Sequence, residues 1–204
     1  VVMTLTRRLA KKLEAAGYDV VLTRKGDKYL SLDERTAIAN AAKGDLFISI
    51  HANAHPRRDR HGIETYFLNV TDDRYAARLA ARENGVAAPA AVEGESAVRR
   101  ILTDLDAKSS AGASERLAQL VQREVCSGVR ERYGDVRNLG VKNALFYVLV
   151  GARMPAVLVE AGFVSNRAEE QRLTTAQYAE EVAEGITRAV QSFATREAKL
   201  AAAQ

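Results

Sequence analysis

Cysteine, aromatic residues and long apolar runs are all scarce in this sequence, and each scarcity narrows the possible functions. The single cysteine, Cys126, excludes an internal disulfide. Tryptophan is absent and aromatic residues make up 6% of the chain, so nucleobases would find little surface on which to stack. No apolar run approaches the roughly 20 residues that a membrane-spanning helix needs. We therefore expect no disulfide framework, no nucleic-acid partner and no membrane span.

The beginning of the chain lacks the features of a leader sequence. No positively charged stretch followed by an apolar segment is present. Instead Val2, Leu5, Leu9 and Leu13 already recur at helical spacing. We therefore expect this chain to be part of a longer protein, with any export signal further upstream.

The sequence is mildly basic. Its formal net charge is +4, which suits an anionic partner such as a cell-wall polymer. The lysines and arginines are spread along expected helices beside acidic residues rather than gathered into blocks. This spread argues further against a nucleic-acid-binding face.

The composition and the apolar pattern indicate one α/β domain. Hydrophobic residues make up 47% of the 204 residues and charged residues 27%, which is ordinary for a soluble domain with a sizeable core. The first part of the chain alternates between helix (1–16 and 31–43) and strand (18–23 and 46–50). Ser31 and Glu34 form a capping box that starts the second helix. We predict a mixed, mostly parallel sheet flanked by helices on both faces.

Two strands that read as fully buried end in polar residues with catalytic potential. One run, 46–50, is followed by His51, and the other, 156–159, by Glu160. If these strands are parallel neighbours, the imidazole and the carboxylate emerge at the same edge of the sheet. A histidine and a carboxylate so placed favour a metal-assisted hydrolase. Asn53 offers an amide on the same face as His51, so it is a candidate substrate-binding residue.

Each of these residues also has a structural interpretation. His51 could be a hydrogen-bonded core histidine, and Glu160 could form an ion pair with Arg153 or Lys142. Glu64 lies within a strand of alternating pattern, where an outward-facing side chain is the simpler interpretation. Burial after three apolar residues should nevertheless raise the pKa of Glu160, which suits a general base.

Four motifs carry a resemblance to a known family. They are Ser-Leu-x-x-Arg-x-x-x-Ala-Asn at 31–40, Ser-Ile-His-Ala-Asn at 49–53, Gly-Ile-Glu-Thr-Tyr at 62–66 and Pro-Ala-Val-Leu-Val-Glu-Ala-Gly-Phe-Val-Ser-Asn at 155–166. In this order and spacing the sequence resembles the zinc-dependent N-acetylmuramoyl-L-alanine amidases of the cell-wall-hydrolase type. The likeness covers most of the chain, 1–198, and we expect the residues from Lys199 to Gln204 to fray.

The resemblance implies a peptidoglycan hydrolase. Such an enzyme cleaves the amide between N-acetylmuramic acid and the L-alanine of the stem peptide. In the family two histidines and a glutamate hold Zn²⁺; His51 would be the second of these histidines, and Glu160 the general base that activates water. The first histidine and the ligand glutamate, together with the first strand, would lie upstream of Val1. We therefore expect an N-terminally truncated domain whose zinc site is incomplete and which is inactive in this form.

The segment 84–113 resembles a regulatory insertion. It begins with residues that lack periodicity, continues with an amphipathic pattern over 95–107 and ends in a small-residue break over 108–113. In the division-associated amidases of Gram-negative bacteria a similar insertion plugs the active site until an activator protein displaces it. The plug could reach the metal through one of three acidic residues, which are Glu95, Asp104 and Asp106. A surface helical hairpin is the alternative.

The expected partners and location follow from the substrate. We expect a monomer that acts on peptidoglycan in the periplasm or cell envelope of a bacterium, with an activator protein as a further partner. The alternative function is a non-catalytic cell-wall-binding domain that keeps the amidase fold without the metal.

Overall fold

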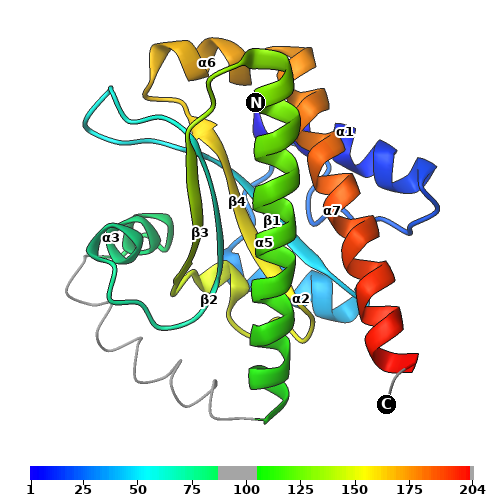
Figure 1. Cartoon of the computed structure of the whole chain (residues 1–204). Helices are drawn as coiled ribbons and strands as arrows, with labels where there is room; N and C mark the ends of the chain where they lie inside the picture. The colour runs from blue at the N-terminus through cyan, green and yellow to red at the C-terminus, as the bar shows by residue number, and fades with distance from the viewer. Residues whose placement is uncertain (87–104, 203–204) are drawn as a thin grey trace.

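A four-stranded mixed sheet forms the centre of the computed structural model, which describes residues 1–86 and 105–202 (Figure 1). The strands follow the spatial order β1-β4-β2-β3. β4 runs parallel to β1 and antiparallel to β2, and β2 runs parallel to β3. This arrangement confirms the predicted mixed, mostly parallel sheet. The strands are β1 (Phe47–Asn53), β2 (Ile63–Leu68), β3 (Asn138–Ala144) and β4 (Ala156–Phe163).

The register of the sheet brings the two predicted polar strand ends together. β1 and β4 pair so that His51 lies directly opposite Glu160. On the other side of β4, the antiparallel pairing with β2 places Glu64 opposite Glu160. The prediction that the two strands are parallel neighbours is therefore confirmed, and a third polar residue shares their row across the sheet.

Three long helices cover one face of the sheet: α1 (Val2–Ala15), α5 (Leu105–Tyr133) and α7 (Ala176–Ala202). α5 and α7 pack along each other, and α1 lies against α7 (Figure 1). Apolar side chains such as Leu9, Val121 and Ile186 join Val157 and Val159 of the sheet in the main core. Lys12 also donates to Glu180 and Glu184 across the boundary between α1 and α7.

Shorter elements cover the opposite face: α2 (Leu32–Ala41), α3 (Arg74–Glu83) and the 3-10 turn η2 (Tyr147–Leu149). A second apolar cluster fills this side, where Tyr66 and Leu158 of the sheet meet Leu79 and Phe146. α6 (Arg167–Leu173) follows the end of β4. α2 begins with the predicted capping box, since Ser31 and Glu34 exchange side-chain-to-backbone hydrogen bonds.

The predicted strand at 18–23 is wrong. These residues form no strand, and Val21 is 60% exposed. The run is apolar enough for a strand, but β1 is the edge of the sheet and no described strand lies beside 18–23 to satisfy its backbone groups. Periodicity reports a preference for burial, whereas a strand also requires a hydrogen-bonded neighbour.

The predicted break at 108–113 is also wrong, because α5 is continuous from Leu105 to Tyr133. The small side chains there serve close packing: Ala113 is buried, and Ser114 Oγ accepts a hydrogen bond from the backbone N–H of Ala156. α7 likewise extends to Ala202, so the tail expected to fray from Lys199 is helical up to that point. Its residues are good helix formers. Within the described residues, no helix combines the length and the apolarity that crossing a membrane requires.

Candidate metal centre

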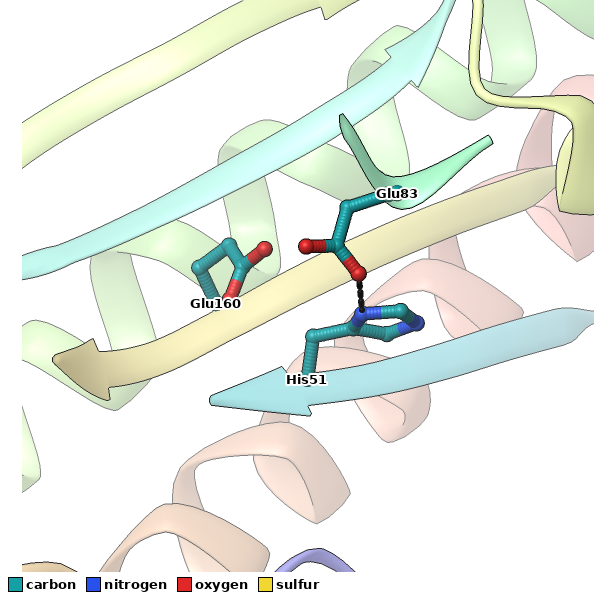
Figure 2. Close-up of side chains that lie close together, drawn as sticks. All are labelled: His51, Glu83 and Glu160. Carbon is teal, nitrogen blue, oxygen red and sulfur yellow. Dashed lines mark hydrogen bonds and ion pairs between the residues drawn. The ribbon is translucent and has the colours of Figure 1, made fainter. Parts of the chain in front are cut away.

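His51 lies near the end of β1 and faces the C-terminal end of α3. Its Nδ1 is 3.0 Å from Oε2 of Glu83, the last residue of α3 (Figure 2). The imidazole is 18% exposed, so it is neither fully buried nor free in solvent. This hydrogen bond holds the ring in a defined orientation and lowers the pKa of the Glu83 carboxyl.

Glu160 is a buried carboxylate whose surroundings differ from those of His51. It is 0% exposed, and neither Oε1 nor Oε2 has a partner among the described residues. Burial is the largest cause that raises its pKa well above the usual range, followed by the nearby charges of Glu83 and Glu64; Arg82 partly offsets them. The proposed ion pair with Lys142 is absent because Lys142 binds Glu64 instead, and no ion pair between Glu160 and Arg153 occurs in the described part of the chain.

His51, Glu83 and Glu160 form a group that fits a metal ion. Each residue offers a ligand atom, and these atoms all lie within 4.8 Å of one another. Figure 2 shows the three side chains projecting into the same space from β1, α3 and β4. Imidazole nitrogen and carboxylate oxygen are both common zinc ligands. An unsatisfied buried carboxylate is costly in isolation, and either a cation or a proton would offset its charge.

A second buried acid lies beside this group and is fully bonded. Glu64 Oε1 accepts from Asn53 Nδ2 and from the Tyr75 hydroxyl, both at 2.9 Å, and Oε2 accepts from Lys142 Nζ at 2.7 Å. The simpler interpretation of Glu64 as an outward-facing residue is therefore wrong, because the side chain is 0% exposed. Both faces of this sheet are covered, so strand alternation does not lead to solvent at this position.

Comparison with known proteins identifies the family. The N-acetylmuramoyl-L-alanine amidase family matches residues 1–192 of this chain. This chain belongs to that family.

Individual relatives agree with this assignment. The amidase LytC of Bacillus subtilis is 30% identical over 90% of this chain, and AmiC of Neisseria meningitidis is 32% identical over 95% of it. The chain spans 28% of LytC and 46% of AmiC, so it corresponds to less than half of either relative. The crystal structure of an N-acetylmuramoyl-L-alanine amidase from Clostridium difficile superimposes with a TM-score of 0.69 at 29% identity, covering 95% of this chain and 81% of that one.

Sequence analysis did not single out Glu83 in this amidase domain. The residue lies 32 positions beyond His51, at the end of a helix that reads as an ordinary amphipathic one. One signal was available. A carboxylate in the last turn of a helix meets the negative end of the helix dipole, so it needs a compensating partner elsewhere. His51 and the neighbouring Arg82 provide that compensation.

Asn53, the candidate substrate-binding residue, is buried within the protein's own network. Its amide nitrogen donates to Glu64, and its Oδ1 accepts from Arg82 at 2.9 Å. It thereby ties β1 to β2 and to α3. A direct role in substrate binding stays a prediction.

The predicted autoinhibitory residues lie largely outside the described part of the chain. Glu95 and Asp104 fall between residues 86 and 105. Asp106 lies at the beginning of α5, and its side chain is not among those described. The regulatory role of the segment 84–113 therefore stays a prediction, although its last residues belong to the continuous helix α5.

Proposed function

We propose that this chain hydrolyses the amide between N-acetylmuramic acid and the L-alanine of the peptidoglycan stem peptide. One observation carries the proposal within the family: Glu160, a buried carboxylate without a hydrogen-bond partner in the described part of the chain, lies opposite His51 across two parallel strands. A structural role gives no reason to keep such a group unsatisfied, whereas a reaction centre does.

The residues of the centre fit Zn²⁺ as the cofactor. His51 and Glu83 would hold the ion, with Glu160 adjacent to it. When bound, zinc supplies a Lewis acid that polarises the amide carbonyl and makes water easier to deprotonate. The family resemblance implies that His51 is joined by an upstream histidine and an upstream glutamate, a set of three ligands that leaves one position for water. We propose that full activity depends on these upstream ligands, and that Glu83 holds the ion only where they are absent.

Glu160 is suited to moving the proton. Its raised pKa makes the carboxylate a stronger base than an exposed glutamate. In the proposed reaction Glu160 accepts a proton from the attacking water while the water oxygen bonds to the carbonyl carbon. When the carbon–nitrogen bond breaks, the same carboxyl donates a proton to the alanine nitrogen. The products are a lactyl carboxylate and a peptide with a free amine.

Regulation by the segment between α3 and α5 forms part of the proposal. An acidic residue of this segment would compete with substrate until an activator protein displaced it, as in cell-division amidases. The continuity of α5 sharpens the test, because a deletion of 84–113 would remove core residues such as Ala113. In the version extended upstream, replacing only 87–104 by a short flexible linker should raise activity. Unchanged activity in that variant would contradict the plug.

The location and partners follow from the substrate. Peptidoglycan lies outside the cytoplasmic membrane, so we propose that the protein acts in the periplasm or cell envelope. We propose further that it acts as a monomer.

The function is tested on purified peptidoglycan. The 204-residue chain and a version extended upstream are incubated with sacculi, with Zn²⁺ or with a chelator. We expect the extended version to release stem peptides that begin with a free L-alanine, and the chelator to prevent release. Mass spectrometry of the soluble products distinguishes the outcomes. Products that keep muramic acid joined to peptide would contradict amidase activity, and binding without release by both versions would support a non-catalytic cell-wall-binding domain instead.

A further inference from the structure

The loop that joins β1 to β2, residues 54–62, carries unpaired positive charge beside the metal centre. It contains three arginines and one aspartate. Arg57 pairs with Asp59 at 2.6 Å, so these two charges neutralise each other. Arg58 and Arg60 form no ion pair with any described residue. Two guanidinium groups therefore remain available in a loop that begins three residues after His51.

Hydrogen bonds fix this loop to the segment that follows β4. The backbone N–H of His55 donates to Ser165 Oγ at 2.9 Å, and Asn166 donates to the carbonyl of Arg58 at 3.0 Å. At the far end the N–H of Gly62 donates to Glu169 at 2.8 Å. Both ends and the middle of the loop are thus held at the edge of the sheet where β1 and β4 end. The backbone that carries the two arginines therefore has a defined place relative to the ends of β1 and β4.

Arg60 is linked through Tyr75 to Glu64, the residue next to the metal centre in the sheet. Its guanidinium carbon lies 5.0 Å from the centre of the Tyr75 ring, a cation–π contact that orients the group. The Tyr75 hydroxyl in turn donates to Glu64, the residue opposite Glu160 in the sheet. Lys142 also contacts this ring, at 4.6 Å, but its charge is already satisfied by Glu64.

The two sides of the site have opposite charge. Glu83 and Glu160 make the reaction centre acidic, whereas the adjoining loop presents Arg58 and Arg60. A substrate that places a neutral amide at the centre and an anionic group a short distance away would therefore be bound in one orientation. Guanidinium groups also match the geometry of a carboxylate, to which they can donate two parallel hydrogen bonds.

We propose that Arg60, assisted by Arg58, binds a free carboxylate of the stem peptide beyond the alanine at the cleaved amide. The proposal rests on the proposed function for its substrate. It makes Arg60 a specificity-determining residue: the chain distinguishes acidic stem peptides from those whose carboxylates are amidated. The charges then bind the substrate in one orientation, with its amide at Glu160 and its free carboxylate at the loop 54–62.

The test uses two soluble probes, a muramyl stem peptide with free carboxylates and the same molecule with those carboxylates amidated. Binding of each to the 204-residue chain is measured by calorimetry at low and high salt. We expect the acidic probe to bind about fivefold more tightly at low salt, with the preference shrinking as salt screens the charges. Arg60→Gln should abolish the preference, and Arg60→Lys should restore part of it, because a lysine keeps the charge without the paired donors.

A matched control and a second variant keep the interpretation clear. Arg153→Gln removes the same charge from an exposed residue before the start of β4, and it should leave the preference unchanged. Arg58→Gln should reduce the preference partly, and circular dichroism checks that each variant is folded. Equal binding of the two probes by the wild type, or a preference that survives Arg60→Gln, would overturn the proposal. Cleavage of either probe by the extended version supports the amidase function separately, so the failure of one proposal is distinguishable from the failure of the other.

Discussion

Glu64 and Glu160 lie opposite each other on neighbouring strands, and both are fully buried, yet their surroundings differ completely. Glu64 accepts hydrogen bonds from an amide, a phenol and an ammonium group, which satisfy both of its oxygens. Glu160 accepts none from the described residues. Burial alone therefore does not reveal the role of an acid in this sheet. The two acids differ in the hydrogen-bond donors that surround them.

The two acids therefore have different roles: Glu64 stabilises the structure, and Glu160 is available for the reaction. The bonds to Glu64 tie three strands and α3 together through Asn53, Lys142 and Tyr75, so this acid stabilises the frame that positions His51. Glu160 makes no such bonds to the described residues, so its carboxylate is available to bind a metal ion or a proton. A buried acid that the protein does not satisfy is a candidate for chemistry, because its cost must be offset by function.

The largest expected effect is the loss of activity when Glu160 is replaced. Glu160→Gln keeps the shape of the side chain but removes the base, so peptide release from peptidoglycan by the extended version should fall by a factor of about 10² to 10⁴. High-performance liquid chromatography of the released peptides measures the loss. Retention of more than a tenth of the activity would show that another group transfers the proton.

The next largest expected effect is the difference in unfolding free energy between variants of Glu64 and of Glu160. Glu64→Gln leaves Lys142 without its buried partner and should lower the free energy of unfolding by about 2 kcal/mol, below the range for fully buried pairs because Lys142 is 22% exposed. The matched Glu160→Gln replaces a buried carboxyl group that has no hydrogen-bond partner among the described residues, and it should leave the stability of the metal-free chain unchanged or raise it. Urea unfolding followed by circular dichroism measures both. Equal losses in the two variants would remove the distinction drawn between the two acids.

The smallest expected effect is the stabilisation of the 204-residue chain by added Zn²⁺. In the 204-residue chain we expect Zn²⁺ to bind weakly, with an increase in unfolding free energy of at most about 1.4 kcal/mol at a concentration ten times the dissociation constant. His51→Ala should abolish this increase, whereas His55→Ala should preserve it, because His55 lies outside the metal group. Calorimetric titration gives the stoichiometry. Tight binding of one Zn²⁺ by the wild type would show that His51, Glu83 and Glu160 suffice and that no upstream ligands are needed.

Local signals in the sequence predicted much of the frame of this site. The apolar runs before His51 and Glu160 indicated buried strands, and the capping box of Ser31 and Glu34 placed the start of α2. These predictions are confirmed because they depend on short-range patterns, in which burial and backbone conformation leave a direct trace.

Other parts depended on neighbours that a local pattern does not contain. The run at 18–23 has the composition of a strand, but none of the described strands lies beside it. The small residues at 108–113 resemble a break but provide close packing within α5. In both cases the tertiary surroundings overrode the local preference.

The sequence by itself determined which residues end the buried strands, and through its motifs it determined the family. Only the tertiary structure decided how the acids differ. It brought Glu83 to His51 from 32 positions away, surrounded Glu64 with donors and left Glu160 without a donor from residues 1–86 and 105–202. The physical reason is that a strand's pattern records how deeply a side chain is buried. The groups that compensate the charge of that side chain come from elements distant in the chain, so the local sequence does not indicate them.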